Sequence, residues 1–208
     1  MDACPQCNFT QSLLGDEVVE RTLNLYDALL PGVMTGTPEI NADDLLVTVP
    51  PYCVSFKGGA GVFAIPGSKE LFLFPSLLYT QLSAASQLGS RGKDVSRNIL
   101  QSVEKLARDL RNHVRATKVL IDTSPFFGGA THLSWVAADA LIIPVRVDQH
   151  SMEALKLTLS MLKNPDMDFL RLNAQAGITK VPKIHAIAMT HCGWNRQSAF
   201  TPDRSTLR

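Results

Sequence analysis

The chain has 208 residues, the length of one domain or slightly more. It is 45% hydrophobic and 19% charged, so it can form a sizeable core, and this composition excludes disordered and low-complexity proteins. The formal net charge is only +1, but residues 1–50 carry eight acidic residues and one basic residue, whereas residues 171–208 carry six basic residues and one acidic residue. Such a basic end is either a surface for polyanions or an ordinary solvated face.

Sequence signals for membranes and for export are lacking. No apolar run approaches the ~18–20 residues that a membrane-spanning helix needs, and the N-terminus lacks the basic start and apolar stretch of a secretion signal. Four cysteines are too few for a disulfide scaffold, which suits a reducing compartment. The sequence therefore predicts a cytoplasmic protein with no membrane span.

Strand and helix patterns alternate through the second half of the chain. The apolar spacing predicts a short buried strand at 71–74, an amphipathic helix at 94–114 and a buried strand at 118–122, then a short helix through 135–138, a strand at 140–145, a helix at 152–162 and a strand at 183–190. Residues 31–69 hold five of the 12 prolines and six of the 13 glycines, and we expect them to form an irregular excursion from a single domain spanning 1–208.

The predicted strands are apolar without alternation, which is typical of strands buried on both faces of a parallel sheet. We therefore expect an α/β fold with a doubly wound, mainly parallel sheet. Ligands of such sheets bind beyond the carboxyl ends of the strands, which indicates Asp122, residues 144–148 and residues 190–195. An aspartate in the position of Asp122 either holds Mg²⁺ through water near the phosphates of a nucleotide or only caps the next turn.

Four segments together resemble one protein family. The first ten residues, MDACPQCNFT, match the D-x-D-P-Q-x-N-x-T motif of ParA-type partition ATPases, the deviant Walker A (MinD/ParA) class, at Asp2, Pro5, Gln6, Asn8 and Thr10. The segments VLIDTSP at 119–125, AADALIIPV at 137–145 and AIAMT at 186–190 also resemble the family, in the same order and with similar spacing.

The resemblance implies a P-loop NTPase-type ATPase domain of plasmid or chromosome partition. Members bind Mg·ATP, pair face to face as homodimers and are stimulated by a ParB-type partner protein; some bind DNA non-specifically. Transferred to this chain, it implies that Asp2 and Asp122 are the catalytic and Mg²⁺-binding carboxylates. The nucleotide-binding residues that it implies are Pro5, Gln6, Asn8, Thr123, Pro144, Val145 and Thr190.

The chain departs from the family at three points. The phosphate loop K-G-G-x-G-K-[ST], together with the first strand and the helix that follows the loop, would precede the Asp2 motif and is not in this sequence. Cys4 replaces the second aspartate of D-x-D, and a thiol is a poor substitute for that carboxylate. The chain also looks shortened at its C-terminal end. We therefore expect it to hydrolyse ATP feebly or not at all by itself.

Other motifs have simpler interpretations. The segment KGGAG at 57–61 begins like the phosphate loop but continues with Val62 and Phe63, and is read as a turn. Cys4 and Cys7 have the C-x-x-C spacing of redox dithiols and half-zinc sites, yet two chance cysteines in the motif explain them as well. The five histidines lack metal-ligand spacing. Two alternatives to the ATPase remain: a non-catalytic module that binds nucleic acid or a partner, and a dithiol redox protein.

Overall fold

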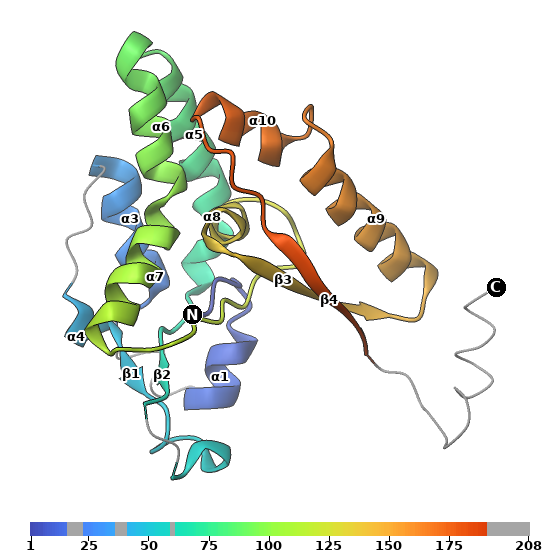
Figure 1. The fold of residues 1–208 in the computed structure, drawn as a ribbon. Helices are drawn as coiled ribbons and strands as arrows, with labels where there is room; N and C mark the ends of the chain where they lie inside the picture. The colour runs from blue at the N-terminus through green and yellow to red at the C-terminus, as the bar shows by residue number, and fades with distance from the viewer. Residues whose placement is uncertain (16–22, 36–40, 59–60, 191–208) are drawn as a thin grey trace. The chain divides into compact units, whose positions relative to one another are not determined.

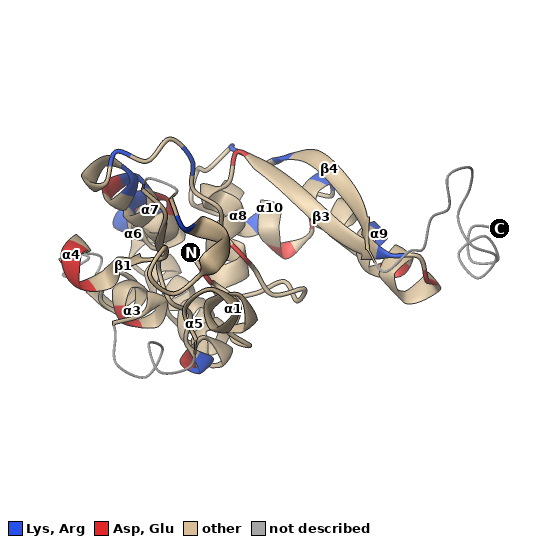
Figure 2. Cartoon of the chain, turned by 90° about the horizontal axis from the view of Figure 1, so that it is seen from below, with Lys and Arg blue, Asp and Glu red and all other residues tan. Residues whose placement is uncertain are grey.

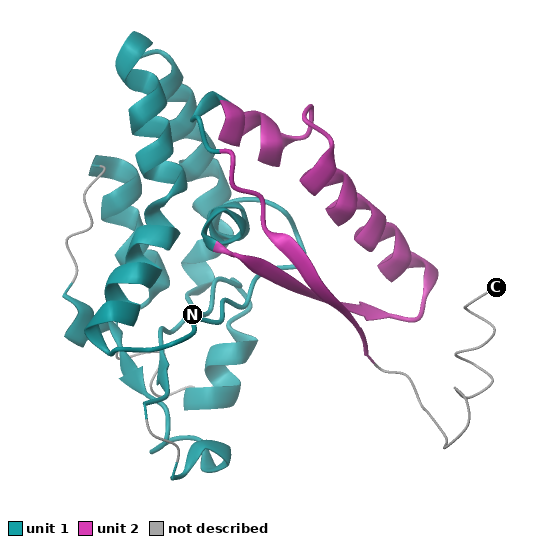
Figure 3. Ribbon diagram, in the orientation of Figure 1, with its two compact units in different colours: residues 1–137, 175–178 teal, residues 138–174, 179–208 magenta. Residues whose placement is uncertain are grey.

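The computed structural model describes residues 1–15, 23–35, 41–58 and 61–190, which belong to two compact units (Figure 3). Unit 1 comprises Met1–Ala137 together with Gln175–Ile178, and unit 2 comprises Ala138–Ala174 and the chain from Thr179 onwards. None of the described helices is both long and apolar enough to cross a membrane.

Unit 1 consists mainly of helices around an apolar core (Figure 1). Its α-helices are α1 (Asn8–Leu14), α3 (Leu25–Thr35), α4 (Ala42–Leu45), α5 (Phe74–Ser86), α6 (Gly92–Leu100), α7 (Ser102–His113) and α8 (Ala130–Ala137). Helix α5 packs against α6, and α7 packs against α8. Phe74, Leu78, Leu100, Val103 and Leu133 are fully buried in this core.

The strand expected at 71–74 is wrong. Residues Lys69–Phe72 form the 3-10 helix η2, and α5 begins at Phe74. Pro75 does not stop a strand but lies in the first helical turn, where its missing N–H is not needed. Phe74, Leu78 and Leu82 are buried at a spacing of four residues, which gives α5 one apolar face.

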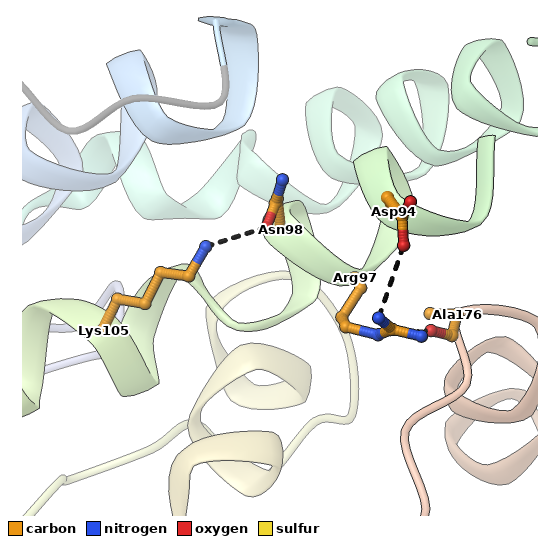
Figure 4. A network of polar contacts seen from close by, with 5 residues as sticks. All are labelled: Asp94, Arg97, Asn98, Lys105 and Ala176. Atoms are coloured by element: carbon orange, nitrogen blue, oxygen red, sulfur yellow. Dashed lines mark hydrogen bonds and ion pairs between the residues drawn. The ribbon is translucent and has the colours of Figure 1, made fainter. Parts of the chain in front are cut away.

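The helix expected at 94–114 is divided into α6 and α7 at Gln101, which ends one helix and precedes the next. Ile99 and Leu100 at the end of α6 and Val103 and Leu106 of α7 are all buried, so the apolar face that the spacing predicts is present on both helices. Arg97 of α6 donates a hydrogen bond from Nε to the carbonyl oxygen of Ala176 (3.0 Å) and contacts Asp94 (Figure 4). This contact fixes the 175–178 segment on α6 within unit 1.

The irregular excursion expected at 31–69 contains short regular elements. Besides the end of α3 and the one-turn α4, it holds the antiparallel strands β1 (Val47–Thr48) and β2 (Phe63–Ala64) and the 3-10 helix η1 (Val54–Phe56). Val49 and Ala64 form a small core cluster with Leu14 of α1. The excursion thus packs onto the helix that follows the N-terminal motif.

Unit 2 contains the two strands that the sequence predicts with nearly the observed bounds. β3 (Ala140–Arg146) pairs in parallel with β4 (Lys183–Thr190), from Ala140↔Lys183 to Arg146↔Thr190. Helix α9 (Gln149–Lys163) packs against β3, and α10 (Asp168–Gln175) follows it along the chain.

The expectation that these strands are buried on both faces is wrong, because the side chains of Ile142 and Ile187 are 60% and 47% exposed. Wide parallel sheets are covered by helices on both faces, whereas this sheet has two strands among the described residues. The segment 118–122 is also not a buried strand. It contributes a single isolated bridge at Asp122, and Leu120 is 67% exposed. The described residues thus form an α/β structure with a small parallel sheet.

Candidate functional site

The structure brings the two predicted motif segments of unit 1 together. Asp2 and Asp122 form an isolated parallel bridge although 120 positions separate them. The Ala3 N–H donates to the Asp122 carbonyl oxygen (2.8 Å), and the Asp122 N–H donates to the Met1 carbonyl oxygen (2.9 Å). The Asp2 N–H donates to the carbonyl oxygen of Ile65 on its other side (3.1 Å). Asp2 therefore lies between two segments that are remote in sequence.

The side chain of Asp2 is fully buried and accepts three hydrogen bonds. The Cys4 N–H donates to Oδ1 (3.1 Å), and the N–H and hydroxyl of Thr10 donate to Oδ2 (2.9 and 2.5 Å). The Thr10 hydroxyl oxygen in turn accepts from the Gly67 N–H (2.8 Å). Buried carboxylates are stable when they are hydrogen-bonded in this way, so this geometry accounts for Asp2 at 0% exposure without any ligand.

Asp122 has a different environment, because its side chain is half-buried. Burial raises the pKa of the Asp122 carboxyl above its ordinary value, and the nearby charge of Asp2 raises it further. The ammonium group of Met1 opposes this shift. That ammonium donates to the Leu120 carbonyl oxygen (2.9 Å), and burial lowers its pKa to about 6. A desolvated carboxylate beside a second carboxylate favours the approach of a cation.

Cys4 and Cys7 are both buried, in the turn that leads into α1. Burial raises the pKa of the Cys4 thiol and raises that of Cys7 to about 11. Reactive dithiols need lowered pKa values, so the environment opposes the redox interpretation. Cys7 precedes α1 with φ of 57°, a left-handed conformation that is unfavourable for a side chain with Cβ.

The other predicted residues of unit 1 lie around this turn. Pro5 is half-buried and Gln6 exposed, and the Asn8 side-chain amide donates to Oε1 of Gln6 (3.4 Å). Thr123 directly follows Asp122 and is half-buried. These residues cluster in the chain around Asp2 and Asp122, and their contact with a nucleotide stays a prediction.

The remaining predicted residues belong to unit 2 and lie at the carboxyl ends of its two strands. Pro144 pairs with Ala188, and the Thr190 hydroxyl donates to the carbonyl oxygen of Val145 (3.2 Å). Asp148, just beyond β3, accepts from the Ser151 N–H (2.8 Å) and thereby caps α9. This hydrogen bond lowers the pKa of the Asp148 carboxyl. Residues 191–195, also expected near the ligand, lie outside the described residues.

Whether Asp122 holds a hydrated Mg²⁺ stays a prediction. Mg²⁺ in proteins retains several waters and is held by one or two carboxylates. The half-buried Asp122 carboxylate would supply one of them. Within the described ranges no group of three or more His, Cys, Asp or Glu side chains could hold a metal, so a Cys4–Cys7 zinc site is not formed there. Of the KGGAG segment, Gly59 and Ala60 lie outside the described residues. β2 begins at Phe63, two positions after Gly61, where a phosphate loop would lead into a helix.

Sequence reasoning gave no role to Thr10 or Gly67, which both contact Asp2. Thr10 was part of the matched motif, and its spacing of eight residues from Asp2 is the signal that was available. Gly67 carried no signal, because it lies 65 residues away. An ideal Cβ at Gly67 would lie 2.9 Å from Asp2 Cγ, so this position needs glycine.

Comparisons with known proteins identify the fold. No protein-family model matches the chain, and no curated protein matches it. Protein DIP2308 from Corynebacterium diphtheriae is 20% identical with a TM-score of 0.59, over 77% of this chain and 55% of that one. A partition protein is 17% identical with a TM-score of 0.60, over 99% of this chain and 50% of that one. Apo McdA from Cyanthece is 16% identical with a TM-score of 0.56, over 99% of this chain and 65% of that one.

The chain thus spans between half and two thirds of the length of these solved structures. Sequence identity this low carries the fold and no activity. The described residues share the fold of ParA-type partition proteins.

Proposed function

We propose that this chain belongs to a partition-type, nucleotide-dependent ATPase whose Mg²⁺ site lies at Asp122. The observation that carries the proposal is the Asp2–Asp122 bridge, which joins the two segments that resemble the family motifs. The fold shared with partition proteins supports it. In the complete protein we propose Mg·ATP binding between two face-to-face copies, with hydrolysis stimulated by a ParB-type partner.

The role of each group follows from its surroundings. The half-buried Asp122 carboxylate would hold hydrated Mg²⁺, which neutralises phosphate charge when a nucleotide is bound. Pro5, Gln6, Asn8 and Thr123 of unit 1 would contact the nucleotide. For Pro144, Val145 and Thr190 of unit 2, contact with a nucleotide stays a prediction from the resemblance. Cys4 in place of an acidic residue has a buried thiol with a raised pKa, which does not replace a carboxylate that orients water.

The test measures cation binding and turnover on the 208-residue chain. Titration with Mn²⁺, followed by electron paramagnetic resonance, should show a site that Asp122→Asn removes. The exposed Asp109 of α7 is a matched control, and Asp109→Asn should leave that site unchanged. ATP hydrolysis should stay at the level of a protein-free blank. Mn²⁺ binding that survives Asp122→Asn would overturn the proposed Mg²⁺ site, and strong Mg²⁺-dependent turnover would overturn the expectation that this chain is inactive by itself.

A second candidate function is a non-catalytic module that binds nucleic acid. The observation that favours it is a group of basic residues on α6, α7 and the segment after α7, which Figure 2 shows in blue, with Arg111, Arg115 and Lys118 exposed. By contrast, Arg171 of the basic C-terminal region pairs with Asp168 (2.5 Å). Arg196, Arg204 and Arg208 lie outside the described residues.

DNA retention without ATP separates this function from the first. Phosphate contacts release counterions, so retention should fall steeply as salt rises. Replacing Arg111 and Arg115 together by alanine should reduce retention, whereas Arg171→Ala should not. Retention that is insensitive to salt would exclude this function.

A further inference from the structure

The side chains of Asp2 and Asp122 differ in their hydrogen bonds and in their exposure. Both oxygens of Asp2 are occupied, by the N–H of Cys4 and by two groups of Thr10. All three donors come from the turn and helix that directly follow Asp2. The side chain is also 0% exposed, so a cation reaches it only if this network opens. The Asp122 side chain is accessible in comparison.

Thr10 connects this network to a third segment of unit 1. Its hydroxyl group donates to Asp2 and accepts from the Gly67 N–H, so both of its hydrogen-bonding functions are used inside the protein. Thr10 is 2% exposed, and the space at Gly67 is too small for a Cβ. The position of the Asp2 side chain is therefore fixed from two sides.

Asp2 is joined to Asp122 through the backbone. The two bridge hydrogen bonds, from Ala3 N–H and from Asp122 N–H, flank Asp2 on either side. A rotation or shift of residue 2 would change both bonds and thereby move the backbone that carries the Asp122 carboxylate. Fixing Asp2 is thus a way to hold Asp122 in place.

We infer that Asp2 and Thr10 are positioning residues and that Asp122 alone presents its carboxylate to a cation. The buried Asp2–Thr10–Gly67 network holds the strand-like pairing of residues 1–3 with 120–122, and this pairing orients Asp122. The inference rests on the proposed function only for the identity of the ligand. Its structural part concerns the backbone pairing and is independent of any ligand.

The experiment compares Thr10→Val, Thr10→Ser, Asp2→Asn and Asp122→Asn in the 208-residue chain. Hydrogen exchange of the Ala3 and Asp122 amides, measured by NMR, reports on the pairing. We expect Thr10→Val to raise both exchange rates at least tenfold and Thr10→Ser to restore them to within threefold, whereas Asp122→Asn should not raise them. Unchanged exchange in Thr10→Val would overturn the inference.

Mn²⁺ affinity then separates positioning from ligation. We expect Asp122→Asn to abolish binding, whereas Asp2→Asn and Thr10→Val weaken it by roughly three- to tenfold. If Asp2→Asn and Asp122→Asn lose the same Mn²⁺ affinity while the amide exchange rates of Asp2→Asn stay unchanged, Asp2 is a ligand and the inference is overturned. Absence of Mn²⁺ binding in the unmodified chain would remove the proposed function, while the exchange rates would still decide the positioning role. If Thr10→Val does not fold, Asp2→Asn provides the same exchange comparison.

Discussion

Gly67→Ala tests the packing around Asp2 directly. An added Cβ would lie 2.9 Å from Asp2 Cγ and 3.1 Å from both the carbonyl oxygen and Oδ2 of Asp2. These distances are shorter than ordinary van der Waals contacts, and the neighbouring atoms are a backbone and a fully buried carboxylate that cannot move freely. Overpacking of this kind costs ~1–3 kcal/mol. The same shift would lengthen the bond from the Gly67 N–H to Thr10.

Gly32 of α3 provides a matched control. An ideal Cβ there has its nearest contact at 3.8 Å, on Cβ of Ser102, which is an ordinary distance. Alanine is favoured over glycine inside a helix by ~0.5–1 kcal/mol, so Gly32→Ala should stabilise the chain. The two substitutions add the same methyl group, and the structure predicts opposite signs.

The assay is urea unfolding followed by the fluorescence of Trp135 in a Trp194→Phe background. Trp135 is buried in α8 and lies 5.1 Å, between ring centroids, from Phe127, so it reports on unit 1. We expect a lower unfolding midpoint for Gly67→Ala and an equal or higher one for Gly32→Ala. A free energy of unfolding for Gly67→Ala within about 0.5 kcal/mol of the unmodified chain would refute the reasoning, since overpacking typically costs at least twice that.

Four further outcomes are expected. Cys7→Gly should be more stable than Cys7→Ala by about 1 kcal/mol, because only glycine adopts the positive φ without strain; equal urea midpoints would contradict this. In the folded chain at pH 8, a thiol reagent should modify half-buried Cys53 well before Cys4 and Cys7, and rapid labelling of the pair would revive the redox interpretation. Asp122→Asn should stabilise the chain at pH 7, because the folded state raises the pKa of this carboxyl and so disfavours its ionised form. The gain should vanish as the pH falls towards 3.8, and a gain that persists there would have another cause. Burial lowers the pKa of the Met1 ammonium in the 208-residue chain from 8.0 to about 6, so between these pH values the unfolded state binds more protons than the folded state. The free energy of unfolding should therefore rise by up to ~3 kcal/mol between pH 6 and 8. One added N-terminal residue should flatten that rise.

The sequence alone determined those elements whose local pattern agrees with their final environment. The strands at 140–146 and 183–190 and the helix at 149–163 are continuous apolar or amphipathic segments, and the structure places them nearly where the pattern predicts. The motif around Asp2 and the segment ending in Asp122 were likewise visible in sequence, because residue identity and order carry that information. Whether these residues bind a nucleotide stays a prediction.

Only the tertiary structure decided the rest, because those features depend on neighbours that are distant in the chain. Pro75 signals equally a strand end and a first helical turn, and the packing of α5 against α6 selects the helix. The exposure of Leu120 and Ile142 follows from how few strands surround them, which apolar composition does not reveal. The different environments of Asp2 and Asp122 arise because Thr10 and Gly67, eight and 65 positions away, enclose one carboxylate and leave the other accessible.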